Sequence, residues 1–156
     1  MDKSTVVRAF ENAFHSNISV DDQNLTQNDF RELEDSVPLM KSGDLLHYLP
    51  LILVNLLEDL DSDRDASHRL ERLMDYLDVT INTYYEKMEQ EKTLAVLDQA
   101  QSCAMATWFA YIEQSSSTEK LLASSLRLIN ENKKYWEERC KGIRTPRSLP
   151  RRVDDD

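Results

Sequence analysis

The sequence contains little glycine and proline, two and four residues respectively in a chain of 156. Turns and tight loops depend on these two residue types, so their scarcity excludes an all-β protein with many turns. Gly43 and Gly142 are far apart, which excludes a glycine-rich loop that could cradle phosphate. The apolar fraction of 40% is nevertheless too high for a wholly disordered chain, and the length suits a single domain.

The sequence also lacks a long hydrophobic run. Its N-terminus shows no basic segment followed by the apolar stretch of a secretory signal. The longest apolar stretch, Leu45 to Leu57, is interrupted by His47 and Asn55 and falls short of the roughly 18 residues of a membrane-spanning helix. We therefore expect a cytoplasmic protein with no membrane partner.

Cysteine is scarce too, with Cys103 and Cys140 as the only two. Counting alone allows one disulfide, but free thiols are the rule in the cytoplasm and are the expectation here. Cys103 lies in an apolar stretch, which is typical of a small buried hydrophobic side chain.

The patterns that are present are helical. They predict an all-α fold: a single-domain bundle of about five to seven helices over residues 1–141, followed by a tail over 142–156. Ser4 is the expected cap of a first helix, and Thr26, with Asp29 three residues later, opens a second that Pro38 ends.

Residues 50–60 are apolar on nearly every side, which is typical of the central helix of a bundle. Because proline disrupts a helix interior, we expect a short turn through Leu46 or His47 and then a new helix with Pro50 in its first turn. This helix is the best candidate for the core.

Three further helices are expected. One presents Leu70, Leu73, Met74 and Leu77 on a single face and breaks near Asp78, and one is capped by Asp98. Its predicted buried stripe is Ala100, Cys103, Ala104, Thr107, Trp108, Tyr111 and Ile112. The last and longest starts at a capping box of Ser116 and Glu119 and runs to about Cys140.

Acidic residues outnumber basic ones by 29 to 19, a net charge of −10. Residues 141–152 hold five basic and no acidic residues, and residues 154–156 are aspartates, so residues 1–140 carry 14 basic and 26 acidic residues, net −12. This acidity argues against a nucleic-acid partner bound through its phosphates. The basic tail suggests RNA or anionic lipid, but the aspartates offset its charge and a solvated or self-docking tail is preferred.

Aspartates at 59, 61, 63 and 65 resemble a calcium loop, but neither possible register has the required Gly and Glu. His15, His47 and His68 lack metal-ligand spacing, so no catalytic, metal or cofactor residue is assigned. The acidic segments 21–35 and 58–65 and two adjacent tyrosines remain as candidates for binding a partner. The candidate partner-binding residues are Glu58, Asp59, Asp61, Asp63, Asp65, Tyr84 and Tyr85.

Two sequence blocks carry a resemblance. His47-Tyr48-Leu49-Pro50-Leu51 runs into an apolar helix, and Leu97-Asp98-Gln99-Ala100-Gln101 opens a second helix through Ile112. This pattern resembles a family of small uncharacterised bacterial helical proteins with a Tyr-Leu-Pro core helix, over roughly Phe10 to Ile112. Small acidic helical proteins without catalytic residues also resemble, in general type, the immunity proteins that neutralise bacterial toxins.

The leading hypothesis is therefore a non-enzymatic inhibitor, most concretely an immunity protein that occludes a basic, nuclease-like toxin through its acidic surface. The alternative is a structural or adaptor protein, possibly a homodimer through the last helix, where Leu122, Ile129 and Trp136 recur every seven residues. A third hypothesis, an enzyme or metal protein using His47 and nearby carboxylates, has no motif in its support.

Overall fold

The computed structural model describes residues 1–15, 25–60, 66–78, 94–115 and 121–143. Within these ranges the chain is all-helical, with six α-helices, one short 3₁₀ helix and no strand. The helices are α1 (Lys3–Ala13), α2 (Gln27–Ser36), η3 (Val37–Leu39), α3 (Ser42–Asp59), α4 (Ala66–Leu77), α6 (Gln99–Gln114) and α7 (Ala123–Cys140). The all-α prediction is confirmed.

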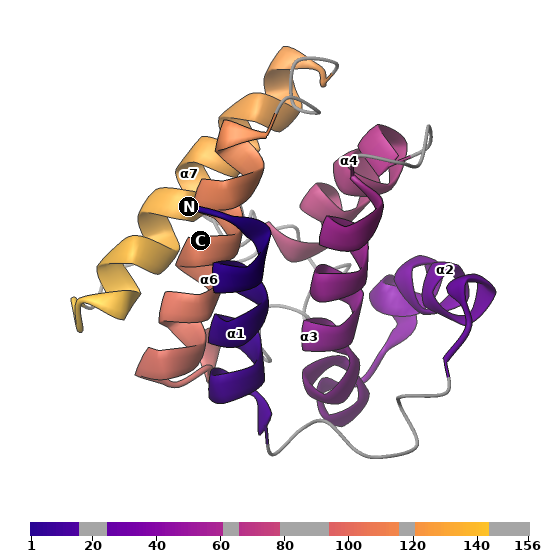
Figure 1. Cartoon of the computed structure of the whole chain (residues 1–156), viewed down its shortest axis with the longest axis horizontal. Helices are drawn as coiled ribbons and strands as arrows, with labels where there is room; N and C mark the ends of the chain where they lie inside the picture. The colour runs from indigo at the N-terminus through magenta and orange to yellow at the C-terminus, as the bar shows by residue number, and fades with distance from the viewer. Residues whose placement is uncertain (16–24, 61–65, 79–93, 116–120, 144–156) are drawn as a thin grey trace, which may run out of the picture.

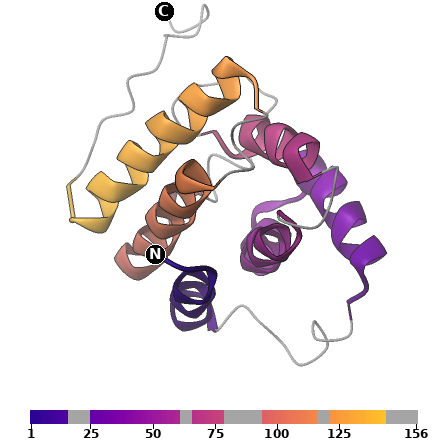
Figure 2. The same ribbon diagram turned by 45° about the horizontal axis from the view of Figure 1, so that its top comes forward.

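The helices form two packed pairs joined by a fifth helix. Helices α6 and α7 lie side by side along their whole length, and α3 contacts α4 (Figures 1 and 2). Helix α1 packs against both α6 and α3, and α4 also reaches α7. Helix α2 contacts α3 on the side of the molecule opposite α7 (Figure 2).

Large side chains fill the space between the pairs. Phe10 and Phe14 of α1 stack with ring centroids 5.4 Å apart, and both are fully buried. The buried indole of Trp108 on α6 donates a hydrogen bond to the backbone carbonyl of Leu53 on α3 at 3.0 Å. This bond satisfies the one polar atom of a side chain whose burial otherwise stabilises the fold through apolar contact. Helical spacing places Val6, Phe10, Ala13 and Phe14 on one face of the first helix; of these, all but the half-buried Ala13 are fully buried. The predicted inward residues of α4 are likewise confirmed as core.

The prediction that Pro50 starts a new helix is wrong. Helix α3 runs without a break from Ser42 to Asp59 with Pro50 in its interior. Leu45 and Leu49 before the proline and Ile52 and Leu53 after it are all fully buried. An internal proline costs about 3 kcal/mol, and the burial of each such leucine or isoleucine contributes roughly 1.5–3 kcal/mol, so tertiary packing outweighs the local penalty.

Helix caps follow the sequence prediction at two starts and differ at one. Thr26 and Asp98 are the N-caps that were expected, and the structure shows each in a capping box, with Asp29 and Gln101 respectively. At α1, however, the cap is Asp2, whose carboxylate accepts a hydrogen bond from the Thr5 backbone N–H at 2.9 Å. Aspartate is as good a cap as serine, and its position two residues earlier lets the helix add a further half turn.

Asp2 supplies a pH-dependent prediction. Hydrogen bonds from the Thr5 hydroxyl, the Ser4 hydroxyl and the Thr5 backbone N–H lower the pKa of Asp2 from its ordinary value of 3.8 to about 2. Because the folded-state pKa lies below the unfolded value, the contribution of this cap is complete above pH 4 and is lost as the pH falls through 2. The Thr5 amide resonance should titrate with a midpoint near pH 2 and stop titrating in Asp2→Ala. A midpoint near 3.8 would contradict this assignment.

Two of the three residues in the seven-residue repeat of the last helix pack inside the molecule. Ile129 and Trp136 are 1% and 0% exposed, whereas Leu122, at the N-cap of α7, is 66% exposed. Ile129 and Trp136 therefore belong to the core of this chain and cannot form a seam between two copies. The predicted capping box of Ser116 and Glu119 lies outside the described residues, and α7 begins after Leu122 with no side-chain cap.

Helix α7 ends at Cys140, as predicted, through a glycine. Gly142 has a φ of 81°, the left-handed conformation that other residues adopt only with strain. Its N–H donates to the Arg139 carbonyl at 3.0 Å, and the Ile143 N–H donates to the Glu138 carbonyl at 2.9 Å. This pair of bonds is the Schellman motif, which satisfies the last helix carbonyls.

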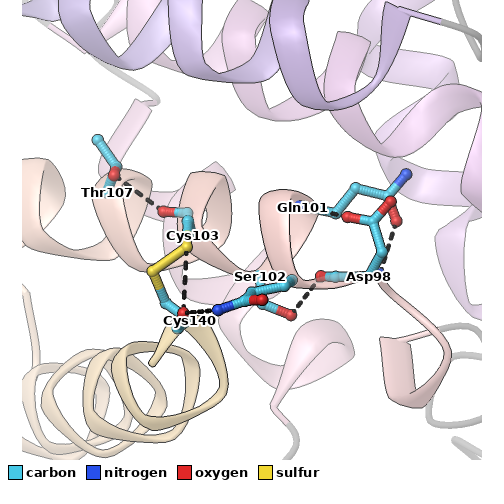
Figure 3. Close-up of a disulfide and its surroundings, with 7 residues drawn as sticks. Asp98, Gln101, Ser102, Cys103, Thr107 and Cys140 are labelled. Atoms are coloured by element: carbon cyan, nitrogen blue, oxygen red, sulfur yellow. Dashed lines mark hydrogen bonds between the residues drawn. A yellow bond between two sulfur atoms is a disulfide. The ribbon is translucent and has the colours of Figure 1, made fainter. Parts of the chain in front are cut away.

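The expectation of free thiols is also wrong. Cys103 of α6 and Cys140 of α7 form a disulfide with their Cα atoms 4.5 Å apart (Figure 3). Both residues are half-buried, so Cys103 is not the fully buried side chain that was expected. Beside the disulfide, the Gln99 side-chain amide donates to the Cys140 carbonyl at 2.8 Å. The start of α6 is thus fastened to the end of α7 twice.

The α6 stripe is broader than predicted. Ala104, Trp108 and Ile112 are buried as expected, but Ala100 is exposed, and the further buried residues of this helix are Ser102, Met105, Ala106 and Phe109. Helix α6 therefore shares with α3 the central place that the sequence assigned to residues 50–60 alone. No helix among the described residues is long and apolar enough to cross a membrane.

Candidate functional site

Two of the seven predicted partner-binding residues lie in the described part of the chain. Glu58 and Asp59 occupy the last turn of α3, whereas Asp61, Asp63, Asp65, Tyr84 and Tyr85 lie outside it, so the predictions for those five stay untested. The side chain of Glu58 is exposed, and that of Asp59 is only 15% exposed. The two neighbours therefore have different roles.

Asp59 belongs to a buried cluster around Arg69. The guanidinium of Arg69 on α4 forms ion pairs with Asp59 at 2.7 Å and with Glu34 of α2 at 2.5 Å. Arg69 also donates to the Asn55 side-chain oxygen at 3.1 Å, and the side-chain amide of Asn55 donates to Gln27 at 2.9 Å. The Gln27 amide in turn donates to Asp59. One arginine thus joins α2, α3 and α4.

This cluster was not predicted, although the sequence holds a signal for it. Arg69 lies three residues after Ala66 and four before Leu73, two positions on the buried face of α4, so helical spacing places it inward. Its side chain is 2% exposed and that of Glu34 is 5% exposed. Because Arg69 offsets one of the two negative charges and both carboxylates are largely buried, Asp59 and Glu34 add less to the acidic surface than exposed carboxylates do.

A groove of about 500 Å³ lies beside this cluster, lined by residues of α1, α2 and α3, and Asn55 belongs to both the cluster and the groove. Its lining is mostly apolar and contains no Lys or Arg: Val7, Phe10, Glu11, Phe30, Pro50, Leu51, Val54, Asn55 and Glu58. Cavities of this volume are large enough to take up side chains or a small ligand. Of the two predicted partner-binding residues that the structure describes, Glu58 lines this groove and Asp59 does not.

Half-exposed apolar side chains form much of the groove surface. Leu51 and Val54, one helical turn apart on α3, are only partly covered, and so are Val7 on α1 and Phe30 on α2. Residues 50–60, which were predicted to form the central helix because they are apolar on nearly every side, are therefore fully buried on one face only. Leu49, Ile52, Leu53, Leu56 and Leu57 are fully buried on the core side.

Other polar contacts hold helices together. The Asn132 amide of α7 donates to the buried Asp78 carboxylate at 2.8 Å. Glu113 of α6 accepts hydrogen bonds from Lys133 at 2.6 Å and from Asn130 at 3.0 Å. The Lys133 ammonium lowers the pKa of Glu113, and the Glu113 carboxylate raises that of Lys133. These groups fix α7 on the domain rather than form a reactive site.

The histidines remain dispersed. His47 packs edge-on against Tyr48, and the His68 side chain is 80% exposed. Among the described residues no group of three His, Cys, Asp or Glu side chains could hold a metal ion. No protein-family model, curated protein or solved structure matches this chain, so the functional argument depends on its own residues.

Proposed function

We propose that this chain is a non-enzymatic binding protein that inhibits a basic partner protein, as an immunity protein does for a basic, nuclease-like bacterial toxin. The observation that carries the proposal is the charge of the chain, −10 overall and −12 over residues 1–140. A field of this sign attracts basic partners and raises the rate of association by orders of magnitude.

The distribution of the described carboxylates supports the proposal. Glu32 of α2 and Asp44 and Glu58 of α3 are exposed, whereas Glu34 and Asp59 share the single positive charge of Arg69 in the buried cluster. Glu58 and the exposed Glu11 of α1 lie on the lining of the groove formed by α1, α2 and α3, which makes this side of the molecule acidic. Inhibition would follow from occlusion, in which this acidic side covers the active site of the partner.

The proposal predicts a salt-dependent association. The purified basic product of the gene beside this one should bind the chain with an association rate constant that falls about 10- to 1,000-fold between low and near-molar ionic strength. Stopped-flow fluorescence measures this rate directly. A rate independent of salt, or no binding at low salt, would contradict attraction by the acidic surface.

The adaptor alternative keeps one observation in its favour. Leu122 and Leu126 are 66% and 41% exposed one turn apart at the start of α7, so a second copy could contact this end of the helix. Light scattering at micromolar concentration separates the two proposals, because only the adaptor proposal requires a dimer. The cytoplasmic location stays a prediction as well, and the Cys103–Cys140 disulfide is more typical of an oxidising compartment.

A further inference from the structure

Helix α3 carries more apolar surface than the described fold covers. One of its faces is fully buried in the core, while Leu51 and Val54 on another face are only partly buried and line the groove together with Val7 of α1 and Phe30 of α2. Half-exposed apolar residues that converge from three helices on one depression differ from scattered single exposures, which are ordinary. This convergence is typical of a surface that receives apolar side chains.

The charges of the groove are of one sign. Glu11 of α1 and Glu58 of α3 are exposed carboxylates on its lining, and neither pairs with a cation among the described residues. The remaining polar group, Asn55, is already bound to Arg69 and Gln27. An occupant that matches this lining has an apolar centre and positive charges at its edges.

We propose that the groove is the docking site for a basic amphipathic helix of the partner protein. Apolar residues of that helix, spaced as i, i+3 or i+4 and i+7, enter between α1 and α2 and contact Leu51, Val54 and Phe30. Lysine or arginine residues that flank this apolar stripe pair with Glu11 and Glu58. The inference rests on the proposed function, since it names the part of the partner that this chain recognises.

A synthetic peptide tests the groove without knowledge of the partner. The probe is a fluorescein-labelled helix-forming peptide of about 18 residues, with leucines along one face and lysines elsewhere. Its Kd for the wild-type chain is measured by fluorescence anisotropy at an ionic strength of about 0.15 M. The control peptide has the same composition in an order without an apolar face, so it has the same net charge.

Matched variants locate the binding. Val54→Gln removes an apolar contact in the groove, and Leu122→Gln makes the same kind of change on α7. We expect only Val54→Gln to raise the Kd of the peptide by about tenfold or more. Glu11→Gln with Glu58→Gln should weaken binding and its salt dependence. Glu32→Gln with Asp44→Asn changes the net charge equally outside the groove and should have a smaller effect. Circular dichroism confirms that each variant is folded.

The inference would be overturned if the chain bound the control peptide as tightly as the amphipathic one, or if Val54→Gln bound the peptide with wild-type affinity. It would also be overturned if the chain associated with itself and Val54→Gln abolished that association, because the groove would then bind a second copy of the chain. These experiments distinguish a wrong docking site from a wrong proposed function. If the groove variants still bind and inhibit the partner protein, the docking site is wrong and the function stands. If the peptide binds in the groove and no partner is inhibited, the docking site is right and the proposed function is wrong.

Discussion

Replacement of Arg69 by methionine is expected to lower the free energy of unfolding by about 3–5 kcal/mol, the range for the loss of one partner from a buried ion pair. The side chain of Arg69 is 2% exposed and those of its partners Glu34 and Asp59 are 5% and 15% exposed. Methionine preserves most of the volume but leaves two carboxylates without their cation. The large effect comes from those unpaired charges rather than from a cavity.

Arg72 provides the matched control one turn further along α4. It pairs with Asp35 at 3.0 Å, but the two side chains are 55% and 60% exposed. Because solvent screens such a pair, Arg72→Met should change stability by less than about 1 kcal/mol. Urea unfolding followed by circular dichroism measures both variants. Equal losses for Arg69 and Arg72 would contradict the assignment of Arg69 as the buried link between α2, α3 and α4.

Reduction of the Cys103–Cys140 disulfide is expected to have a comparable effect. The two cysteines are 37 residues apart, and a closed loop of that length corresponds to about 4 kcal/mol of lost entropy in the unfolded chain at 25 °C. For a chain of this size the melting temperature should fall by roughly 10 °C. Calorimetry with and without a thiol reductant gives the value.

The double variant Cys103→Ser, Cys140→Ser is the control for this measurement. It should melt at the temperature of the reduced wild type, and a reductant should not change its melting temperature. The hydrogen bond from the Gln99 side-chain amide to the backbone carbonyl of residue 140 does not involve either sulfur atom. The helices should therefore stay packed after reduction. A melting temperature unaffected by reductant in the wild type would show that no disulfide links α6 to α7.

Local features of the fold could be predicted from the sequence. The caps at Thr26 and Asp98, the inward faces of α1 and α4 and the end of α7 near Cys140 all depend on residues within one or two helical turns. The cap of α1 was misplaced from Asp2 to Ser4 because both residue types fit the position equally well. Such neighbouring alternatives differ too little in energy for a sequence pattern to separate them.

Features that depend on distant residues could not be predicted. The break expected at Pro50 follows correctly from its local cost, but the burial of Leu45, Leu49 and Leu53 overrides that cost. The spacing of Cys103 and Cys140 says nothing about their proximity, which the antiparallel packing of α6 and α7 creates. In both cases the deciding contacts join parts of the chain that no local pattern relates.

In the candidate site, too, the local features could be predicted from the sequence and the features that depend on distant residues could not. Its acidity was visible in the sequence, and Glu58 lies in the groove as an exposed carboxylate. The neutralisation of Asp59 by Arg69, ten residues later, was not visible, because it depends on the angle at which α4 returns along α3. The groove itself is made by three helices, so no single segment could have predicted it.

The central claim is that this chain inhibits a basic partner, and co-expression tests it most directly. The gene beside this one is expressed in a heterologous host, alone and together with this chain. The account predicts that the neighbouring product stops colony growth when expressed alone and that the wild-type chain restores growth. A neighbouring product that binds the chain but still kills the host at equal expression would contradict inhibition and leave an adaptor as the function.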